Sequence, residues 1–323
     1  FLFIILSILK RNSSIRNIKP SAWASPLRKA AVILLFTVGL SNLASAQMLV
    51  ADKEIADEFG KVLVQDQNGR TKPLFTLSND IVRKVTKENK FENYTSMQVF
   101  MGIYLDFPSW KDVSLIKVTN RDLQKRIGIS GNMASFTDLV DIEGDGSYKL
   151  SEAVNAAYEK SPAERNKFDK EVMKVDERVN IVYMIYKGEF SKIFPLKDGS
   201  GKWGSPEQSL ITTTNKEDSL YLSTVMPMLL ESIDNNNIAA ARKITESMTG
   251  YQKRFSEYSI PAEMRTRAEI LYYKLGIFEK LFPFYFTIGL IMIIILIINV
   301  IKGLKASSLL ISVARWILLS GFI

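Results

Sequence analysis

The chain has 323 residues, contains neither Cys nor His, and carries 42 Lys and Arg against 34 Asp and Glu. Without thiols or imidazoles it has no disulfide, none of the common zinc sites, and neither Ser-His-Asp nor Cys-His catalysis. All 34 acidic residues lie between Asp52 and Glu279, so this block is nearly neutral and the excess positive charge belongs to its flanks. A nucleic-acid-binding domain would carry that excess itself, so we expect no nucleic acid as a partner.

The flanks hold their cations beside apolar stretches. These cations are Lys10, Arg11, Arg16, Lys19, Arg28, Lys29, Lys302, Lys305 and Arg315, and no acidic residue accompanies them. Such a distribution is typical of the cytoplasmic segments of membrane proteins. We therefore expect a multi-pass protein of the cytoplasmic (inner) membrane. Because the chain begins with Phe and stops inside an apolar run, we also expect a fragment of a longer protein.

The N-terminal flank divides into three segments. Residues 1–9 predict the end of a truncated transmembrane helix, and residues 10–29 predict a basic cytoplasmic linker. Residues 30–51 are uncharged and allow two interpretations, an internal transmembrane helix or a signal-like segment with a cleavage site at Ala44-Ser45-Ala46. An earlier apolar segment precedes this one, which favours the transmembrane helix. Both interpretations place residues 52–280 in the periplasm as an extracytoplasmic domain.

The C-terminal flank contains the strongest membrane signal. Residues 281–301 carry no charge and are mostly apolar, and a helix of this length crosses a hydrocarbon core of roughly 30 Å. Residues 302–306 predict a cytoplasmic loop, and residues 307–323 predict the start of a further transmembrane helix. The fold class is therefore a mainly α membrane protein, with the extracytoplasmic domain between transmembrane helices.

The domain itself is predicted to be helical with a short β-hairpin. Asn68-Gly69 between extended residues predicts a hairpin over Val62–Lys72 with a type I′ turn. Capping residues and apolar spacing predict helix starts at Thr76, at Thr95 or Ser96, at Ser161 and at Ser205, a short strand over 113–118, and helices over 119–128, 217–234 and 238–258. Pro261 is expected to start a helix that runs on into the membrane span.

One acidic stretch has the spacing of a calcium-binding loop. In residues 141–152, Asp141, Glu143, Asp145, Gly146 and Glu152 stand at loop positions that an EF-hand uses. Glu at the third position and Lys149 at the ninth fit that pattern poorly, and a second loop to pair with it is missing. The alternative is a surface turn between two helices.

Two segments are candidates for contact with a partner protein. The hairpin offers exposed polar side chains at Gln65, Asp66, Arg70 and Lys72, and the predicted long helix offers both signs of charge at Asp176, Arg178 and Asn180. For each segment the alternative is a brace inside the domain, since ion-pair networks are often structural. Neither segment has a companion base, nucleophile or metal cluster, so we predict no catalytic, cofactor-binding or metal residue here.

Several motifs in this order resemble a known family. They are Phe59-Gly60, Leu63 to Asp66, Gly69-Arg70, Lys72-Pro73, Thr76, Arg83-Lys84, Tyr148 to Leu150, Lys174 to Tyr183, Lys187-Gly188, Ile193 to Pro195, Lys202-Trp203 and Ala268 to Tyr272. Together they resemble the middle of the fused System II cytochrome c biogenesis protein of Bacteroidetes-type bacteria. That family joins a ResB/CcsB-like half to a haem-handling ResC/CcsA-like half.

The resemblance implies a component that delivers haem to the outer face of the membrane and attaches it to apocytochrome c. It implies haem in the full-length protein, with the ResC/CcsA-like half in the same chain and apocytochrome c as partners. We expect no haem ligand in this fragment, because His and Cys are the usual strong ligands of haem iron. The alternative function is an extracytoplasmic sensing or binding domain of a membrane receptor or transporter.

Overall fold

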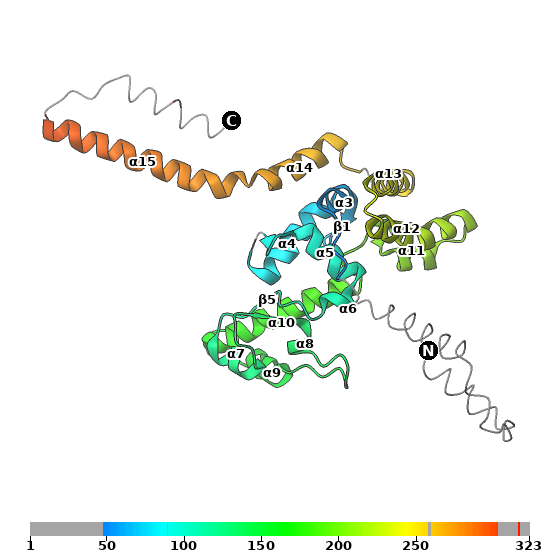
Figure 1. Cartoon of the computed structure of the whole chain (residues 1–323), viewed down its shortest axis with the longest axis horizontal. Coiled ribbons are helices and arrows are strands. Elements are labelled where there is room, and N and C mark those ends of the chain that lie inside the picture. Colours follow the sequence, from blue (N-terminus) through cyan, green and yellow to red (C-terminus); the bar gives the residue numbers. More distant parts are fainter. Residues whose placement is uncertain (1–47, 89, 258–259, 303–315, 317–323) are drawn as a thin grey trace, which may run out of the picture. The chain divides into compact units, whose positions relative to one another are not determined.

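The computed structural model describes residues 48–88, 90–257, 260–302 and 316 (Figure 1). The chain divides into two units, Phe1–Gln47 and Met48–Ile323, and the described residues all belong to the second. The predicted segments 1–9, 10–29 and 307–323, and most of 30–51 and 302–306, therefore lie outside the described residues apart from Trp316.

The second unit is mostly helical, as predicted. Its helices are α3 (Lys53–Phe59), α4 (Leu74–Thr86), α5 (Ser96–Leu105), α6 (Phe107–Trp110), α7 (Arg121–Ile127), α8 (Phe136–Leu139), α9 (Ser151–Glu159), α10 (Lys167–Tyr186), α11 (Pro206–Thr212), α12 (Lys216–Asp234), α13 (Ile238–Phe255), α14 (Glu263–Leu275) and α15 (Ile277–Lys302). Side chains from α3, α4, α5, α10, α12 and α13 share one apolar core, which includes Phe59, Phe100 and Leu229.

Short antiparallel hairpins connect the helices. They are β1 (Leu63–Gln65) with β2 (Thr71–Pro73), β3 (Lys90–Phe91) with β4 (Tyr94–Thr95), β5 (Ile116–Lys117) with β6 (Met133–Ala134), and β7 (Phe194–Pro195) with β8 (Trp203–Gly204). The predicted hairpin over Val62–Lys72 is confirmed as β1–β2. The short strand predicted over 113–118 is present only as the two residues of β5. The strands β3, β4, β6, β7 and β8 are also two residues long, which leaves no alternation of apolar and polar residues to reveal them.

The turn of the β1–β2 hairpin differs from the type I′ prediction. Gly69 has φ +80°, but Asn68 does not adopt the positive φ that a type I′ turn needs at both central residues. Instead, the Asp66 carboxylate accepts hydrogen bonds from the backbone N–H groups of Asn68 at 2.9 Å and Arg70 at 3.0 Å. The side chain of Asp66 therefore organises a five-residue loop, residues 66–70.

Two of the predicted helix starts are confirmed and one is wrong. Thr95 caps α5 in a capping box with Gln98, and Ser205 caps α11 in the same way with Gln208, as predicted. The predicted cap at Thr76 is wrong, because α4 already begins at Leu74, after Pro73. Pro73 fixes the extended backbone just before the helix, and Thr76 is buried in the first turn.

The start predicted at Ser161 for the long helix is also wrong. Ser161 does bond to Glu164, through its N–H at 3.1 Å and its hydroxyl at 2.8 Å, but this closes only an isolated turn. Helix α10 begins at Lys167, where Asn166 and Asp169 form a second capping box. Between the two caps, the Arg165 guanidinium donates to the carbonyls of Ala157 and Lys160, which ties this turn to the end of α9.

The segment before α3 packs on the domain. Residues 48–51 are not helical, although the predicted span extends to Ala51. The Trp110 indole donates to the Leu49 carbonyl at 3.0 Å, and the Gln98 amide donates to the Ala51 carbonyl at 2.8 Å. Trp110 itself lies against Gly102, where a Cβ atom would come within 2.0 Å of the indole ring. Gln98 and Trp110 thus hold residues 49–51 against α5 and α6.

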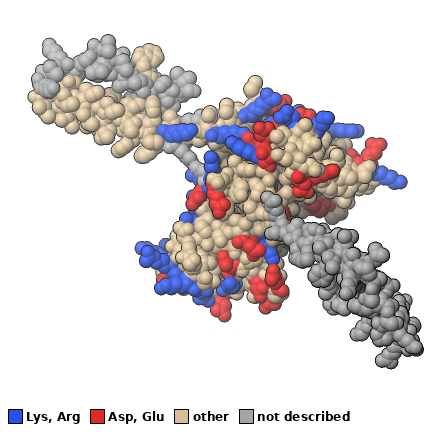
Figure 2. Space-filling model, viewed as in Figure 1, with Lys and Arg blue, Asp and Glu red and all other residues tan. Residues whose placement is uncertain are grey.

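The candidate span is a separate helix. The expected continuous helix from Pro261 is interrupted, because Gly276 adopts φ +56° and ends α14, and α15 then begins at Ile277. Residues Lys280–Ile301 of α15 are long and apolar enough to cross a membrane, and none of them is buried in the structure. In Figure 2 this helix is almost entirely tan, whereas charged side chains cover the domain.

Candidate functional site

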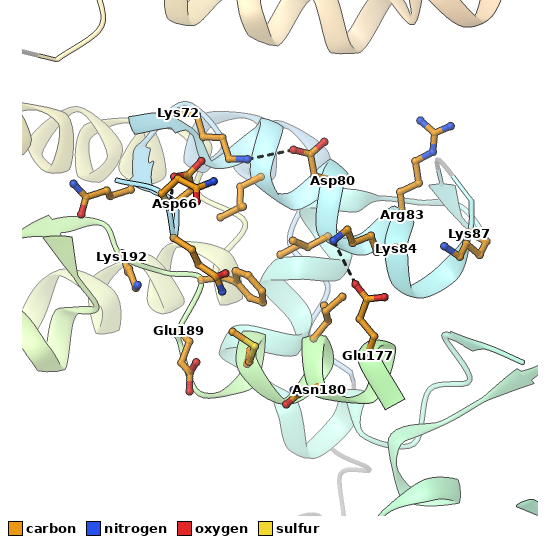
Figure 3. Close-up of a pocket in the computed structure, with 18 residues that line it drawn as sticks. Asp66, Lys72, Asp80, Arg83, Lys84, Lys87, Glu177, Asn180, Glu189 and Lys192 are labelled. Atoms are coloured by element: carbon orange, nitrogen blue, oxygen red, sulfur yellow. Dashed lines mark hydrogen bonds and ion pairs between the residues drawn. The ribbon is translucent and has the colours of Figure 1, made fainter. Parts of the chain in front are cut away.

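A cleft of about 880 Å³ lies between α4 and α10, with the β1–β2 loop at one end (Figure 3). Its floor is apolar and is formed by Leu77, Ile81, Ile181, Met184 and Phe190. Its rim is polar and charged, with Gln65, Asp66, Lys72, Asp80, Arg83, Lys84, Lys87, Glu177, Asn180, Glu189 and Lys192. An apolar centre with a polar rim is the usual make-up of a surface that binds another protein.

Two ion pairs shape the rim of this cleft. Lys84 of α4 reaches Glu177 of α10 at 3.4 Å and so joins the two walls. Lys72 of β2 reaches Asp80 of α4 at 3.3 Å and holds the hairpin against the same wall. Both partners of the Lys84–Glu177 pair are more than half exposed, so this pair is a weak bridge that a ligand can open.

The hairpin residues predicted for partner contact have different roles. Gln65 is half-buried, and its amide oxygen accepts from the backbone N–H of Trp203 at 2.9 Å, which joins the β1–β2 and β7–β8 hairpins. Arg70 lies outside the cleft and pairs with Glu269 of α14 at 3.2 Å. Gln65, Asp66 and Lys72 line the cleft, whereas Arg70 does not.

The three predicted residues on α10 point in different directions. Asn180 is exposed and lines the cleft. Arg178 is buried, with 4% of its side chain exposed, and it donates to the Lys117 carbonyl and pairs with Glu171 at 3.4 Å. Arg178 therefore contacts both α10 and the β5 backbone inside the domain. Asp176 faces Tyr148, and burial raises the pKa of its carboxyl group.

The acidic side chains of residues 141–152 have separate partners in the structure. Glu143 pairs with Lys111, and Glu152 lies in α9 and pairs with Arg126. The Asp141 and Asp145 carboxylates accept backbone hydrogen bonds within the loop, from Gly144 and Ser147. In the part of the chain that the structure describes, no group of three or more acidic residues could hold a metal ion. The stretch forms a turn and the start of α9.

The sequence did not identify most of the cleft. Lys84, Lys87 and Lys192 look like ordinary solvated cations in the sequence, and Met184 and Phe190 look like the end of an apolar helix face. These residues come together because α4 packs against α10, and the two helices are separated by about 100 residues in the chain. The one local signal was the polar hairpin, which supplies the end of the cleft.

Comparison with known proteins gives one informative match. The chain is similar to Protein NrfI of Wolinella succinogenes, with 31% identity over 244 residues. The match covers 75% of this chain and 27% of NrfI, so the chain spans only about a quarter of the length of that relative. No protein-family model matches the chain.

Proposed function

We propose that this chain is part of a c-type cytochrome biogenesis protein, and that residues 48–280 act outside the membrane in the attachment of haem to apocytochrome c. The observation that carries the proposal is the similarity to NrfI, a protein of cytochrome c-type biogenesis. The same similarity gives the receptor or transporter alternative no support. The motifs quoted above support a finer assignment, the ResB/CcsB-like half of a System II protein whose haem-handling half follows in the same chain.

The proposed topology places the domain in the periplasm and both basic flanks in the cytoplasm. It is supported by the cations of the flanks and by the apolar helix α15. Phosphatase fusions at Ser13, Gly199 and Gly303 test it. We expect phosphatase activity only at Gly199, because the enzyme folds only outside the cytoplasm. Activity at Ser13 or Gly303 would overturn the topology.

Within this function we assign the α4–α10 cleft to holding an unfolded segment of apocytochrome c. An unfolded segment exposes apolar side chains that suit the floor, formed by Ile81, Met184 and Phe190 among others. The rim carries both signs of charge, which suits a segment of mixed composition. The chain has no Cys or His, so it offers neither a thiol nor an imidazole to haem. In the proposed function, the ResC/CcsA-like half binds haem and brings it to the apocytochrome. The domain then holds the apocytochrome c segment in a fixed position relative to the haem-handling half.

Replacing Met184 and Phe190 together by Ser tests this cleft. Both side chains are only partly buried in the floor, so we expect a destabilisation of about 1–3 kcal/mol and a folded protein. Holocytochrome yield is expected to fall roughly tenfold, because a site that loses its apolar anchors loses on the order of 1 kcal/mol or more of binding free energy. The measurement is haem staining of cytochrome c in cells that depend on the complete gene, beside the level of the biogenesis protein.

A matched control comes from the same chain. Met133 and Phe168 are also partly buried and pack against the core, but they lie outside the cleft. The Met133→Ser, Phe168→Ser variant should lose similar stability and keep its holocytochrome yield. Equal losses of yield in the two double variants, at equal protein level, would contradict the assignment of the cleft.

A further inference from the structure

A second cleft, of about 690 Å³, lies where the domain meets the start of α15. Its walls come from α3, α4 and the β3–β4 hairpin on one side, and from the end of α14 and the first turn of α15 on the other. Tyr272 and Tyr273 lie beside it, and the Tyr273 hydroxyl donates to Asp80 at 3.1 Å. Burial, followed by the Asp80 carboxylate, raises the pKa of Tyr273 to about 12, which keeps this donor protonated.

This second cleft has a clear excess of positive charge. The cations that line it are Lys53, Arg83, Lys90, Lys274 and Lys280, and the acids are Asp57 and Asp80. Lys274 pairs with Asp57 at 2.8 Å. Lys53, Lys90 and Lys280 are exposed and have no ion-pair partner among the described residues. An anion that entered the cleft would therefore meet three cations that form no ion pair with the residues that the structure describes.

The position of Lys280 relates this charge to the membrane. Lys280 is the first residue of the apolar helix segment that ends at Ile301, and Gly276 lies only about 6 Å before it along a helix axis. The aromatic side chains of Phe282 and Phe286 follow at once, and Phe282 is 76% exposed. Aromatic side chains and lysines at one end of an apolar helix are typical of the headgroup level of a bilayer.

We propose that this cleft binds the headgroup of an anionic glycerophospholipid, with its phosphate between Lys53, Lys90 and Lys280. The proposal rests on the proposed topology, in which α15 crosses the membrane. The exposed Leu275 and Phe282 near the cleft suit acyl chains, which a free phosphate does not have. The lipid would join α15 to α3 and the β3–β4 hairpin and so set the height of the domain above the bilayer.

Spin-labelled lipids measure such selectivity directly. The full chain is reconstituted into phosphatidylcholine bilayers with spin-labelled phosphatidylglycerol or spin-labelled phosphatidylcholine, and the motionally restricted fraction of each label is compared by EPR. We expect phosphatidylglycerol to associate several-fold more strongly than phosphatidylcholine. In the variant Lys53→Gln, Lys90→Gln, Lys280→Gln this preference should fall to parity, because each cation near an anionic lipid contributes about fivefold and the three together account for more than a several-fold preference. These residues are exposed and form no ion pair with the described residues, so the variant should remain folded.

The control removes the same charge elsewhere. Lys216, Lys243 and Lys253 are exposed lysines outside the cleft, and their triple Gln variant should keep the preference. Equal association of the two labels with the unchanged protein, or an equal loss in both variants, would overturn the proposal. So would displacement of labelled phosphatidylglycerol by inorganic phosphate at matched ionic strength, which would point to a free-phosphate site. Sedimentation with the vesicles reports membrane insertion separately, so a failed topology is distinguishable from a failed lipid site.

Discussion

Arg178→Ala is expected to destabilise the domain by about 3–5 kcal/mol, because it leaves the buried carboxylate of Glu171 without its cation. Arg178 and Glu171 are both nearly inaccessible and lie 3.4 Å apart. Arg178 also donates to the Lys117 carbonyl, and Glu171 accepts from the Thr119 N–H at 2.8 Å. The substitution would thus remove the contacts that hold α10 against β5. The measurement is denaturant unfolding of the full chain in detergent micelles.

Arg70→Ala is the matched control for this prediction. It removes the same side chain from the same kind of pair, but the Arg70 side chain is 61% exposed and its partner Glu269, at 3.2 Å, is partly exposed. Such a pair is worth only about 0.2–1 kcal/mol. Adding Glu171→Gln to Arg178→Ala should recover part of the loss, because no unpaired buried charge then remains. A loss below 1 kcal/mol for Arg178→Ala would refute the role as a brace.

The same substitutions separate two causes of lost cytochrome maturation. Arg178→Ala should lower the amount of the protein in cells, and holocytochrome yield should fall in proportion. Arg70→Ala should leave the amount of the protein unchanged. A normal amount of the Arg178→Ala protein with lost yield would favour a contact with a partner over a brace, contrary to the burial of this residue.

Gln252→Leu is expected to cost about 3 kcal/mol, because it leaves buried backbone groups without hydrogen bonds. Gln252 is completely buried, donates to the carbonyls of Leu63 at 2.8 Å and Ile193 at 2.9 Å, and accepts from the Leu63 N–H at 3.3 Å. The residue opposite Leu63 in the hairpin is Pro73, which has no N–H to donate. Gln252 of α13 therefore supplies the hydrogen bonds that the hairpin partner does not.

Denaturant unfolding and amide exchange at Leu63 check this prediction together. The exchange of the Leu63 amide should accelerate if Gln252 is the group that protects it. Gln124→Leu serves as the control, since this half-buried amide donates to one carbonyl, that of Val118, at 2.8 Å, and its loss should cost about 1 kcal/mol. Unchanged exchange at Leu63 in the Gln252→Leu protein would contradict the assignment.

Local chemistry explains what the sequence predicted well. Thr95 with Gln98, Ser205 with Gln208, and Gly128 at the end of α7 act within one turn, so their effect is visible without the rest of the fold. The apolar helix α15 is also a local property, because length and lack of charge alone make it long enough for a membrane. The charge of the flanks likewise needs no fold to be read.

Other features depend on contacts between distant segments. Ser161 and Asn166 both have the sequence of a capping box, but only the Asn166 side chain accepts from a helix N–H, that of Asp169. The Ser161 hydroxyl donates to Glu164, and Arg165 bonds this turn to the end of α9. Arg178 has the spacing of a solvated stripe, yet it is buried because β5 places the Lys117 carbonyl above it. No local pattern predicts either outcome, since each depends on an element elsewhere in the chain.

The candidate sites show the same division most clearly. The sequence by itself determined the polar hairpin, the basic flanks and the apolar span, because these are runs of neighbouring residues. Tertiary structure decided that Asp66 and Lys72 share a cleft with Asn180, and that Lys53 and Lys90 lie near Lys280. It also decided that Gly276 adopts a left-handed conformation that separates α14 from α15. Packing brings together groups that are roughly one to two hundred residues apart in the chain. Periodicity in the sequence describes only one helix or strand at a time, so it cannot predict these contacts.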